Sequence, residues 1–139
     1  MPPPGRTHLL DTNVILRYLM GDDASKARQA ARLMQRLEQG QERVEVIETV
    51  VAESVWTLEK FYRVPKSEIS DKLTTLLGFR GIRCPDKRTI LQAFNLYASS
   101  GSDFVDCLLA AKSLRKKLSI YSFDERDFKK LKVAWERPG

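Results

Sequence analysis

The sequence has a single histidine, His8, and two cysteines, Cys84 and Cys107, which lie far apart in the chain. A single histidine weighs against a zinc site and against RNA cleavage by a histidine pair, and the two cysteines form no C-x-x-C motif. We interpret both cysteines as reduced, half-buried thiols of a cytoplasmic protein. No apolar run approaches the roughly 18 residues that a membrane span needs. Because Met1–Arg6 also lacks the apolar core of a signal peptide, we expect a soluble protein.

Length and composition are those of one globular domain. The chain has 139 residues, of which 42% are hydrophobic and 30% charged, so we expect a single domain over residues 1–139 with a sizeable core. Three prolines and a glycine in residues 1–6 predict a disordered lead-in. The formal net charge of +6 makes a polyanion a plausible partner.

The pattern of apolar residues predicts strands that alternate with helices. A short apolar strand from His8 to Leu10 ends at Asp11, and an apolar-periodic segment follows at once. In the helix expected at 49–62, Trp56 should widen the buried stripe. This order favours an α/β fold with three layers, in which helices cover both faces of a central, mainly parallel sheet. Further helices are expected near 14–19, 23–39, 67–77, 87–100, 104–115 and 127–131, and further strands near 43–47, 81–83, 118–122 and 133–135.

Carboxylates recur where these elements should open onto one sheet edge. Asp11 and Asp124 each follow a strand, and parallel strands end at the same edge of a sheet. Glu53 lies in an apolar helical stretch and should border its buried face, while Asp103 and Asp106 are three apart and share a helix face. Each acid has an ordinary explanation as a turn former, a helix cap or a surface residue. Because these acids are expected to gather at one edge of the sheet, a common functional site explains them better than separate structural roles.

A cluster of carboxylates points to a bound cation. Like charges repel, so such a cluster is costly unless a cation holds it together. Oxygen ligands alone select hard ions such as Mg²⁺ or Mn²⁺. These ions activate a water and stabilise the charge that develops in phosphodiester hydrolysis, and this chemistry needs no histidine.

Four segments of the chain carry a family resemblance. Leu10–Val14, Val51–Glu53, Asp103–Ala111 and Ser122–Phe128 resemble, in this order, the four signature segments of PIN-domain nucleases. The resemblance is nearest to the VapC-type toxins of bacterial toxin–antitoxin modules and spans the chain from Leu9 to about Leu131. Ser122 stands where that family more often has threonine, which is a mild departure.

The resemblance implies a three-layer PIN-like fold and a Mg²⁺- or Mn²⁺-dependent endoribonuclease. A metal-activated water would attack phosphorus and leave a 3′-hydroxyl and a 5′-phosphate. Asp106 ranks above Asp103 because it precedes a Leu-Leu-Ala-Ala run, and Asp127 is interpreted as structural. The implied catalytic and metal-binding acids are Asp11, Glu53, Asp106 and Asp124, with Asp103 as an accessory metal ligand and Thr12 or Asn13 shaping the pocket.

The resemblance also implies partners: an RNA substrate, a second copy in a homodimer, and a small antitoxin that binds a groove and blocks the site. Basic residues at a helix C-terminus are candidates for phosphate contacts, although a solvated surface would explain them equally. These candidates are Lys112, Arg115, Lys116 and Lys117.

Other classes are less compatible with the same residues. A phosphatase of the haloacid-dehalogenase type needs Asp-x-Asp after the first strand, whereas this chain has Asp11 followed by Asn13. A receiver-type phosphoacceptor module needs an acidic pair at that strand and a lysine at a late strand end, and the chain offers neither. A non-catalytic RNA-binding module, or a PIN-type nuclease of RNA processing outside a toxin–antitoxin module, stays open as an alternative.

Overall fold

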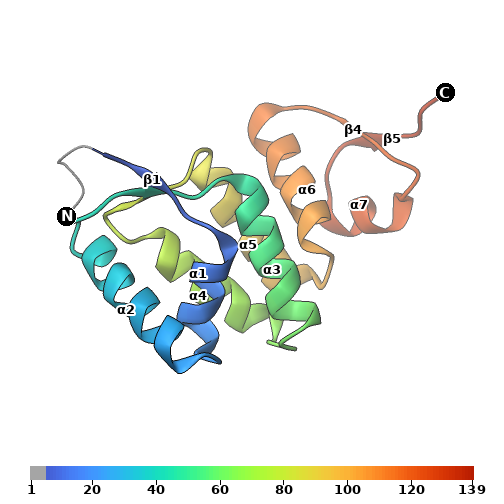
Figure 1. Ribbon diagram of the computed structural model, residues 1–139. Helices are drawn as coiled ribbons and strands as arrows, with labels where there is room; N and C mark the ends of the chain where they lie inside the picture. The colour runs from blue at the N-terminus through green and yellow to red at the C-terminus, as the bar shows by residue number, and fades with distance from the viewer. Residues whose placement is uncertain (1–5) are drawn as a thin grey trace.

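A computed structural model describes residues 6–139 (Figure 1). Except for Arg6, the expected disordered lead-in lies outside the described residues. Helices and strands alternate in the predicted order, and none of the helices in 6–139 is long and apolar enough to cross a membrane. The elements are β1 (His8–Leu9), α1 (Thr12–Met20), α2 (Ala24–Glu38), β2 (Val44–Glu45), α3 (Glu48–Lys60), α4 (Lys66–Leu77), β3 (Ile82–Arg83), α5 (Lys87–Ser100), α6 (Phe104–Lys116), β4 (Ile120–Tyr121), α7 (Glu125–Leu131) and β5 (Trp135–Glu136).

The strands are parallel, which confirms the expected α/β class, and they form two sheets. In the first sheet β2 lies between β1 and β3, with His8 opposite Val44 and Val44 opposite Ile82. In the second sheet β4 pairs with β5, with Ile120 opposite Trp135. Figure 1 shows β4 and β5 beyond α6, away from β1. Within the described part of the chain, β4 therefore pairs only with β5, where the sequence predicted one central sheet.

A turn at the end of α6 directs the chain toward this second sheet. Lys117 adopts the left-handed conformation, with φ of 55°, and ends the helix. The hydroxyl of Ser113 donates to the carbonyl of Leu118 and fixes the turn. The strand that follows runs beside β5.

Aromatic packing between α5 and α6 builds much of the core. The ring of Phe104 lies 5.4 Å from that of Phe94 and 5.9 Å from that of Tyr97, measured between ring centroids. All three side chains are buried, and so are Phe128 and Leu131 of α7. Because these residues belong to one core, α6 and α7 have fixed positions relative to each other.

Helix ends largely follow the sequence prediction. Gly21 ends α1 in the left-handed conformation, and the Asp23 carboxylate accepts a hydrogen bond of 3.0 Å from the Lys26 N–H at the start of α2. The helix expected near residues 67–77 begins at Lys66, with Pro65 rather than Ser67 at the cap position. Proline suits a helix start because it has no amide hydrogen to leave unpaired.

The expected position of Trp56 is also wrong, since its side chain is 63% exposed. Val51, Val55 and Leu58 form the buried stripe of α3. Trp56 lies on the outer face together with Glu53, three residues earlier. The aromatic ring is therefore available at the surface.

Both cysteines are unpaired and buried, and Cys84 is 6% exposed. Burial raises the pKa of the Cys84 thiol to about 11 and also raises the pKa of Cys107. Their thiols are therefore protonated and weakly reactive near neutral pH, which agrees with a structural role.

Candidate metal centre and adjoining cavities

Three carboxylates from two helices converge at one place. Asp106 lies in the first turn of α6, Asp124 at the N-cap of α7 and Asp127 in the first turn of α7. One oxygen atom from each of the three lies within 4.8 Å of the others. Carboxylate oxygens are the ligands that Mg²⁺ prefers, and the spacing is near that of an octahedral site, in which opposite ligands, each about 2.1 Å from the ion, are about 4.2 Å apart. We call these three residues the acid group.

Hydrogen bonds at the start of α7 hold the acid group in place. The Ser122 hydroxyl accepts from the Asp124 N–H at 2.8 Å, and the Asp124 Oδ1 accepts from the Asp127 N–H at 3.3 Å. Phe128, the next residue along the helix, is buried in the core. The helix cap therefore aims Asp124 and Asp127 toward Asp106.

Asp106 and Asp127 of this group have raised pKa values and so hold protons more tightly than usual. Burial and then the charges of Asp127 and Asp124 raise the pKa of Asp106 to about 6. The pKa of Asp127 is also raised, first by its hydrogen bond to Asp124 and then by burial. Gathering the carboxylates is thus unfavourable without a cation, and this is the electrostatic pattern of a cation site.

The acid group contains two of the predicted site residues and one that was assigned another role. Asp106 and Asp124 were predicted as ligands and are brought together. Asp127 was interpreted as structural; its carboxylate lies in the group, and its N–H takes part in the helix cap. The signal was the spacing of Asp124 and Asp127, because residues three apart at a helix start face the same side.

The other predicted acids, Asp11, Glu53 and Asp103, are not members of the acid group. The Asp11 carboxylate accepts from the Thr12 N–H at 2.9 Å and caps α1, and Glu53 is exposed on α3. β1 and β4 belong to different sheets. Asp11 and Asp124 therefore do not share one sheet edge, contrary to the sequence-based expectation.

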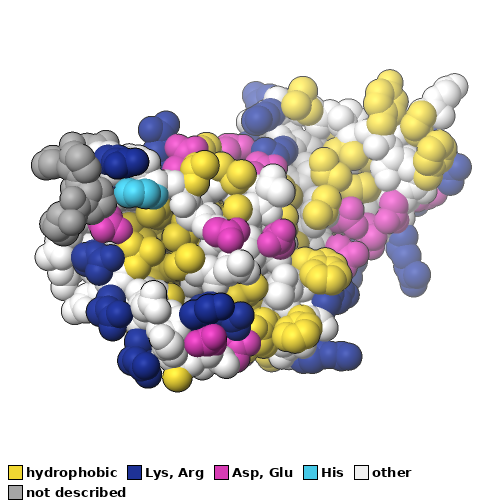
Figure 2. All heavy atoms as spheres, in the orientation of Figure 1, with side chains coloured by type: hydrophobic (Ala, Val, Ile, Leu, Met, Phe, Trp, Pro, Cys, Tyr) yellow, Lys and Arg dark blue, Asp and Glu magenta, His cyan; other side chains and the backbone are white. Residues whose placement is uncertain are grey.

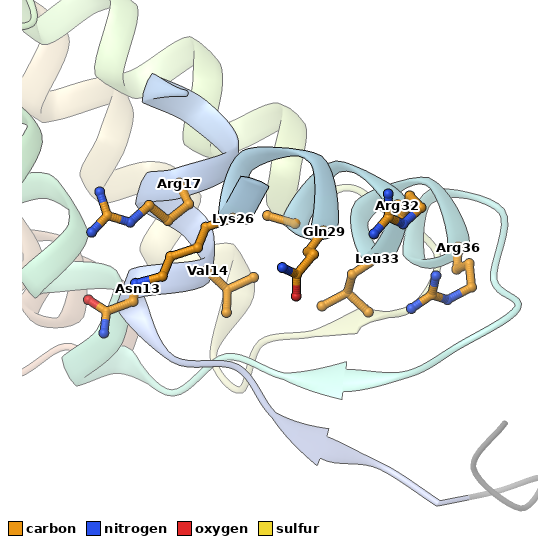
Figure 3. Close-up of a pocket in the computed structure, with 9 residues that line it drawn as sticks. Asn13, Val14, Arg17, Lys26, Gln29, Arg32, Leu33 and Arg36 are labelled. Atoms are coloured by element: carbon orange, nitrogen blue, oxygen red, sulfur yellow. The ribbon is translucent and has the colours of Figure 1, made fainter. Parts of the chain in front are cut away.

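A groove of about 670 Å³ runs between α1 and α2 (Figure 3). Of the two predicted pocket-shaping residues, Asn13 lines this groove and Thr12 is buried. Figure 2 shows lysine and arginine side chains along α2 beside an apolar patch. Within 6–139, no acidic side chain lines the groove. Its lining combines the apolar residues Val14, Ala30 and Leu33 with the basic residues Arg17, Lys26, Arg32 and Arg36, and the amides of Asn13 and Gln29.

A smaller cavity of about 220 Å³ lies between α3 and α6, and Asp106 is part of its wall. Asp103 also lines it, at the N-cap position of α6, where its side chain makes no capping hydrogen bond. The cavity is therefore continuous with the acid group. The α3 wall consists of Ala52, Val55, Trp56, Glu59 and Lys60, and the α6 wall of Asp103, Phe104, Val105 and Asp106.

The four basic candidates differ in their surroundings. The Lys112 ammonium forms ion pairs with Glu48 at 2.9 Å and with Asp86 at 3.1 Å. Arg115, Lys116 and Lys117, by contrast, are exposed at the end of α6. The charge of Lys112 is therefore already compensated within the fold, and the phosphate-binding prediction concerns chiefly the other three.

Comparisons with known proteins agree with the resemblance of the four segments. The family model described as PIN domain matches residues 8–134. A protein of Aquifex aeolicus (strain VF5) described as a VapC ribonuclease is 32% identical to this chain over 124 residues. That match covers 88% of this chain and 90% of the relative, so the two are similar over nearly their whole lengths.

Proposed function

Because the chain belongs to the PIN-domain family, among the nucleases of toxin–antitoxin modules, we propose that it is a metal-dependent endoribonuclease that acts as the toxin of such a module. The observation that carries this proposal is the acid group, in which three carboxylate oxygens lie within 4.8 Å of one another. The proposed setting is the cytoplasm, with RNA as substrate.

Asp106, Asp124 and Asp127 would hold a Mg²⁺ or Mn²⁺ ion. Such an ion, when bound, supplies a water activated for attack on phosphorus and neutralises the charge that develops there. The Asp124 Oδ1 accepts from the Asp127 N–H, and the remaining lone pairs of this carboxylate would be available to the ion. Asp103, which lies near Asp106 at the N-cap position of α6, is proposed as an accessory metal ligand.

Asp11 and Glu53 are proposed catalytic acids on the strength of the resemblance. Both side chains are exposed, so both are open to solvent. Arg115, Lys116 and Lys117 would attract the RNA phosphates, in keeping with a net charge of +6.

The test is a cleavage assay. Purified protein should cut single-stranded RNA in Mg²⁺ or Mn²⁺, and excess EDTA should stop the reaction. Asp106→Asn should lower the rate by at least about 10²-fold because it removes a ligand charge. Asp71→Asn, which changes an exposed carboxylate on α4, should cut like the wild type. Undiminished cutting in excess chelator would overturn the metal mechanism.

One observation favours a second candidate, a non-catalytic RNA-binding module: Asp11 and Glu53 lie outside the acid group. The same assay separates the two, since a binding module would retain RNA without cutting it. A nuclease outside a toxin–antitoxin module is separated by expression in bacteria. A toxin should arrest growth, and Glu53→Gln should relieve the arrest at equal protein level.

We further propose that the groove between α1 and α2 receives the antitoxin. Its apolar lining and basic side chains suit an amphipathic segment with acidic residues. Asn13, which lines the groove, is two residues from Asp11, so the groove begins next to the helix start that Asp11 caps. Arg32→Glu should weaken inhibition by a co-expressed antitoxin without reducing cleavage, and Arg88→Glu, an exposed residue on α5, should change neither.

A homodimer is the proposed assembly, also from the resemblance. Sedimentation over a range of protein concentrations would test it. A single species with the mass of one 15.9 kDa chain at all concentrations would overturn it.

A further inference from the structure

Trp56 presents its indole ring to solvent beside the acid group. The side chain is 63% exposed and lines the cavity of about 220 Å³ between α3 and α6. Val105, on the opposite wall, is 58% exposed. Large apolar side chains that stay exposed next to a polar site commonly mark a surface that binds a partner.

The walls of this cavity have two different characters. Trp56 and Val105 offer flat and apolar contact surface, while Asp103 and Asp106 offer carboxylates. Asp106 belongs to the acid group, so anything bound in the cavity lies beside the place where a phosphate would be cut. A ligand of this cavity must therefore both stack against an aromatic ring and donate hydrogen bonds to carboxylates.

The electrostatics exclude a phosphate from the cavity itself. The one cation among the described residues that line it, Lys60, forms an ion pair with Glu59 at 2.8 Å. The two aspartates would repel a phosphate or an acidic peptide. A nucleobase is uncharged and flat, and its N–H groups can donate to carboxylates. The Asp103 side chain is suited to accept such a bond because it does not cap its own helix.

Resting on the proposed ribonuclease function, we propose that this cavity takes one unpaired nucleobase of a single-stranded RNA, stacked on Trp56 and turned toward Asp103. Stacking on an aromatic ring tolerates any base, because every base has a π-face. The bound base would set which phosphate of the strand meets Asp106. A duplex, whose bases are already stacked, would not use the cavity.

Fluorescence tests the stacking directly, because the chain has two tryptophans and Trp135→Phe leaves Trp56 alone. The probes are an octamer of adenylate and an octamer of abasic ribose phosphates with the same charge, both in EDTA at low salt. The adenylate octamer should quench Trp56 emission and protect it from iodide, and the abasic octamer should do neither. Equal effects of the two probes, or no effect of either, would overturn the proposal. If Trp135→Phe does not fold, the difference between wild type and Trp56→Phe gives the same information.

Binding constants for the adenylate octamer give a second measurement. Trp56→Ala should weaken binding by about 5-fold to 100-fold, the usual effect of losing one stacked base, and Trp56→Phe should restore most of it. Phe61→Ala is the matched control, since Phe61 is an exposed aromatic residue near α3 that does not line the cavity. Equal losses in Trp56→Ala and Phe61→Ala would overturn the proposal.

The outcomes separate this inference from the function on which it rests. Wild-type cleavage that chelator stops, with unchanged binding in Trp56→Ala, overturns the base cavity and leaves the nuclease. Base-dependent quenching without cleavage overturns the nuclease and leaves the cavity. If Trp56 is shielded from iodide before RNA is added, and Trp56→Ala turns a dimer into a monomer, a second copy covers the cavity and the proposal is overturned.

Discussion

The Asp124 carboxylate accepts a hydrogen bond from the Asp127 N–H at 3.3 Å, so one side chain both begins helix α7 and belongs to the acid group. The same turn brings the Asp127 carboxylate to the group. Formation of α7 and assembly of the site are therefore coupled, and substitutions at Asp124 affect both stability and cation binding. The two effects can be separated because asparagine caps a helix as well as aspartate does.

Asp124→Asn should keep the helix cap, whereas Asp124→Ala should lose it. We expect the alanine variant to be less stable than the asparagine variant by about 1 kcal/mol, the usual value of an N-cap. Both should lose cleavage, since both remove the charge of a proposed ligand. Urea unfolding in chelator measures the stability difference. Equal stability of the two variants would mean that the cap contributes nothing to α7.

Since Glu53 lies outside the acid group and Asp106 belongs to it, substitutions of the two should affect cation binding differently. A cation held by the acid group stabilises the folded protein by mass action. Glu53→Gln should retain most of the Mn²⁺-dependent rise in melting temperature, because Glu53 lies outside the group, whereas Asp106→Asn should lose most of it. Thermal melts with Mn²⁺ and with EDTA measure the rise. Loss of the rise in both variants would place Glu53 among the ligands.

Local features of the fold could be predicted from the sequence, because the determinants are neighbouring residues. Gly21 and Asp23 mark the helix boundary between α1 and α2 through their own backbone and side-chain preferences. The pairing of β4 with β5 could not be predicted in this way. β4 has only two residues, and it follows a turn in which Lys117 is left-handed. So short a strand carries too little sequence pattern to indicate whether it pairs with β1 or with β5.

The candidate site was predictable where the acids share one helix or adjacent elements. Asp124 was predicted from its place after a strand, and Asp106 from its helix face and from the family resemblance, and the two do converge. Asp127 was assigned a structural role from its place at a helix start, and the sequence alone did not predict that its carboxylate lies beside Asp106 and Asp124. The burial of Trp56 was mispredicted because it lies at the border of the apolar stripe of α3, where periodicity alone does not assign a face.

The raised pKa of Asp106 predicts a pH dependence of stability in the absence of cations. Its folded-state pKa is about 6 and lies above the ordinary value of 3.8, because of burial and the charges of Asp127 and Asp124. The folded state therefore holds this proton more tightly, so the group favours folding at low pH and loses that contribution as pH rises from about 4 through 6. This is opposite to the behaviour of an acid in an ion pair.

Asp106→Asn should consequently stabilise the protein in chelator at pH 7, on the order of 1 kcal/mol after allowance for solvent screening. At pH 4 the two proteins should be nearly equal in stability, since Asp106 is protonated there. Urea unfolding at both pH values measures the difference. Asp71→Asn is the control and should show no comparable gain. A variant less stable than the wild type at pH 7 would mean that the carboxylates do not repel one another.

The basic residues of α6 should divide into structural and RNA-binding members. Lys112 joins Glu48 and Asp86 through ion pairs of 2.9 and 3.1 Å, so Lys112→Ala should lower stability by less than about 1 kcal/mol and leave RNA affinity nearly unchanged. Arg115 and Lys116 are exposed, and replacing both with alanine should weaken binding of single-stranded RNA. If each neutralises one phosphate, the slope of log affinity against log salt should become shallower by about 1.4. If the salt dependence of RNA affinity changes in Lys112→Ala and not in the double variant, Lys112 binds RNA and Arg115 and Lys116 do not.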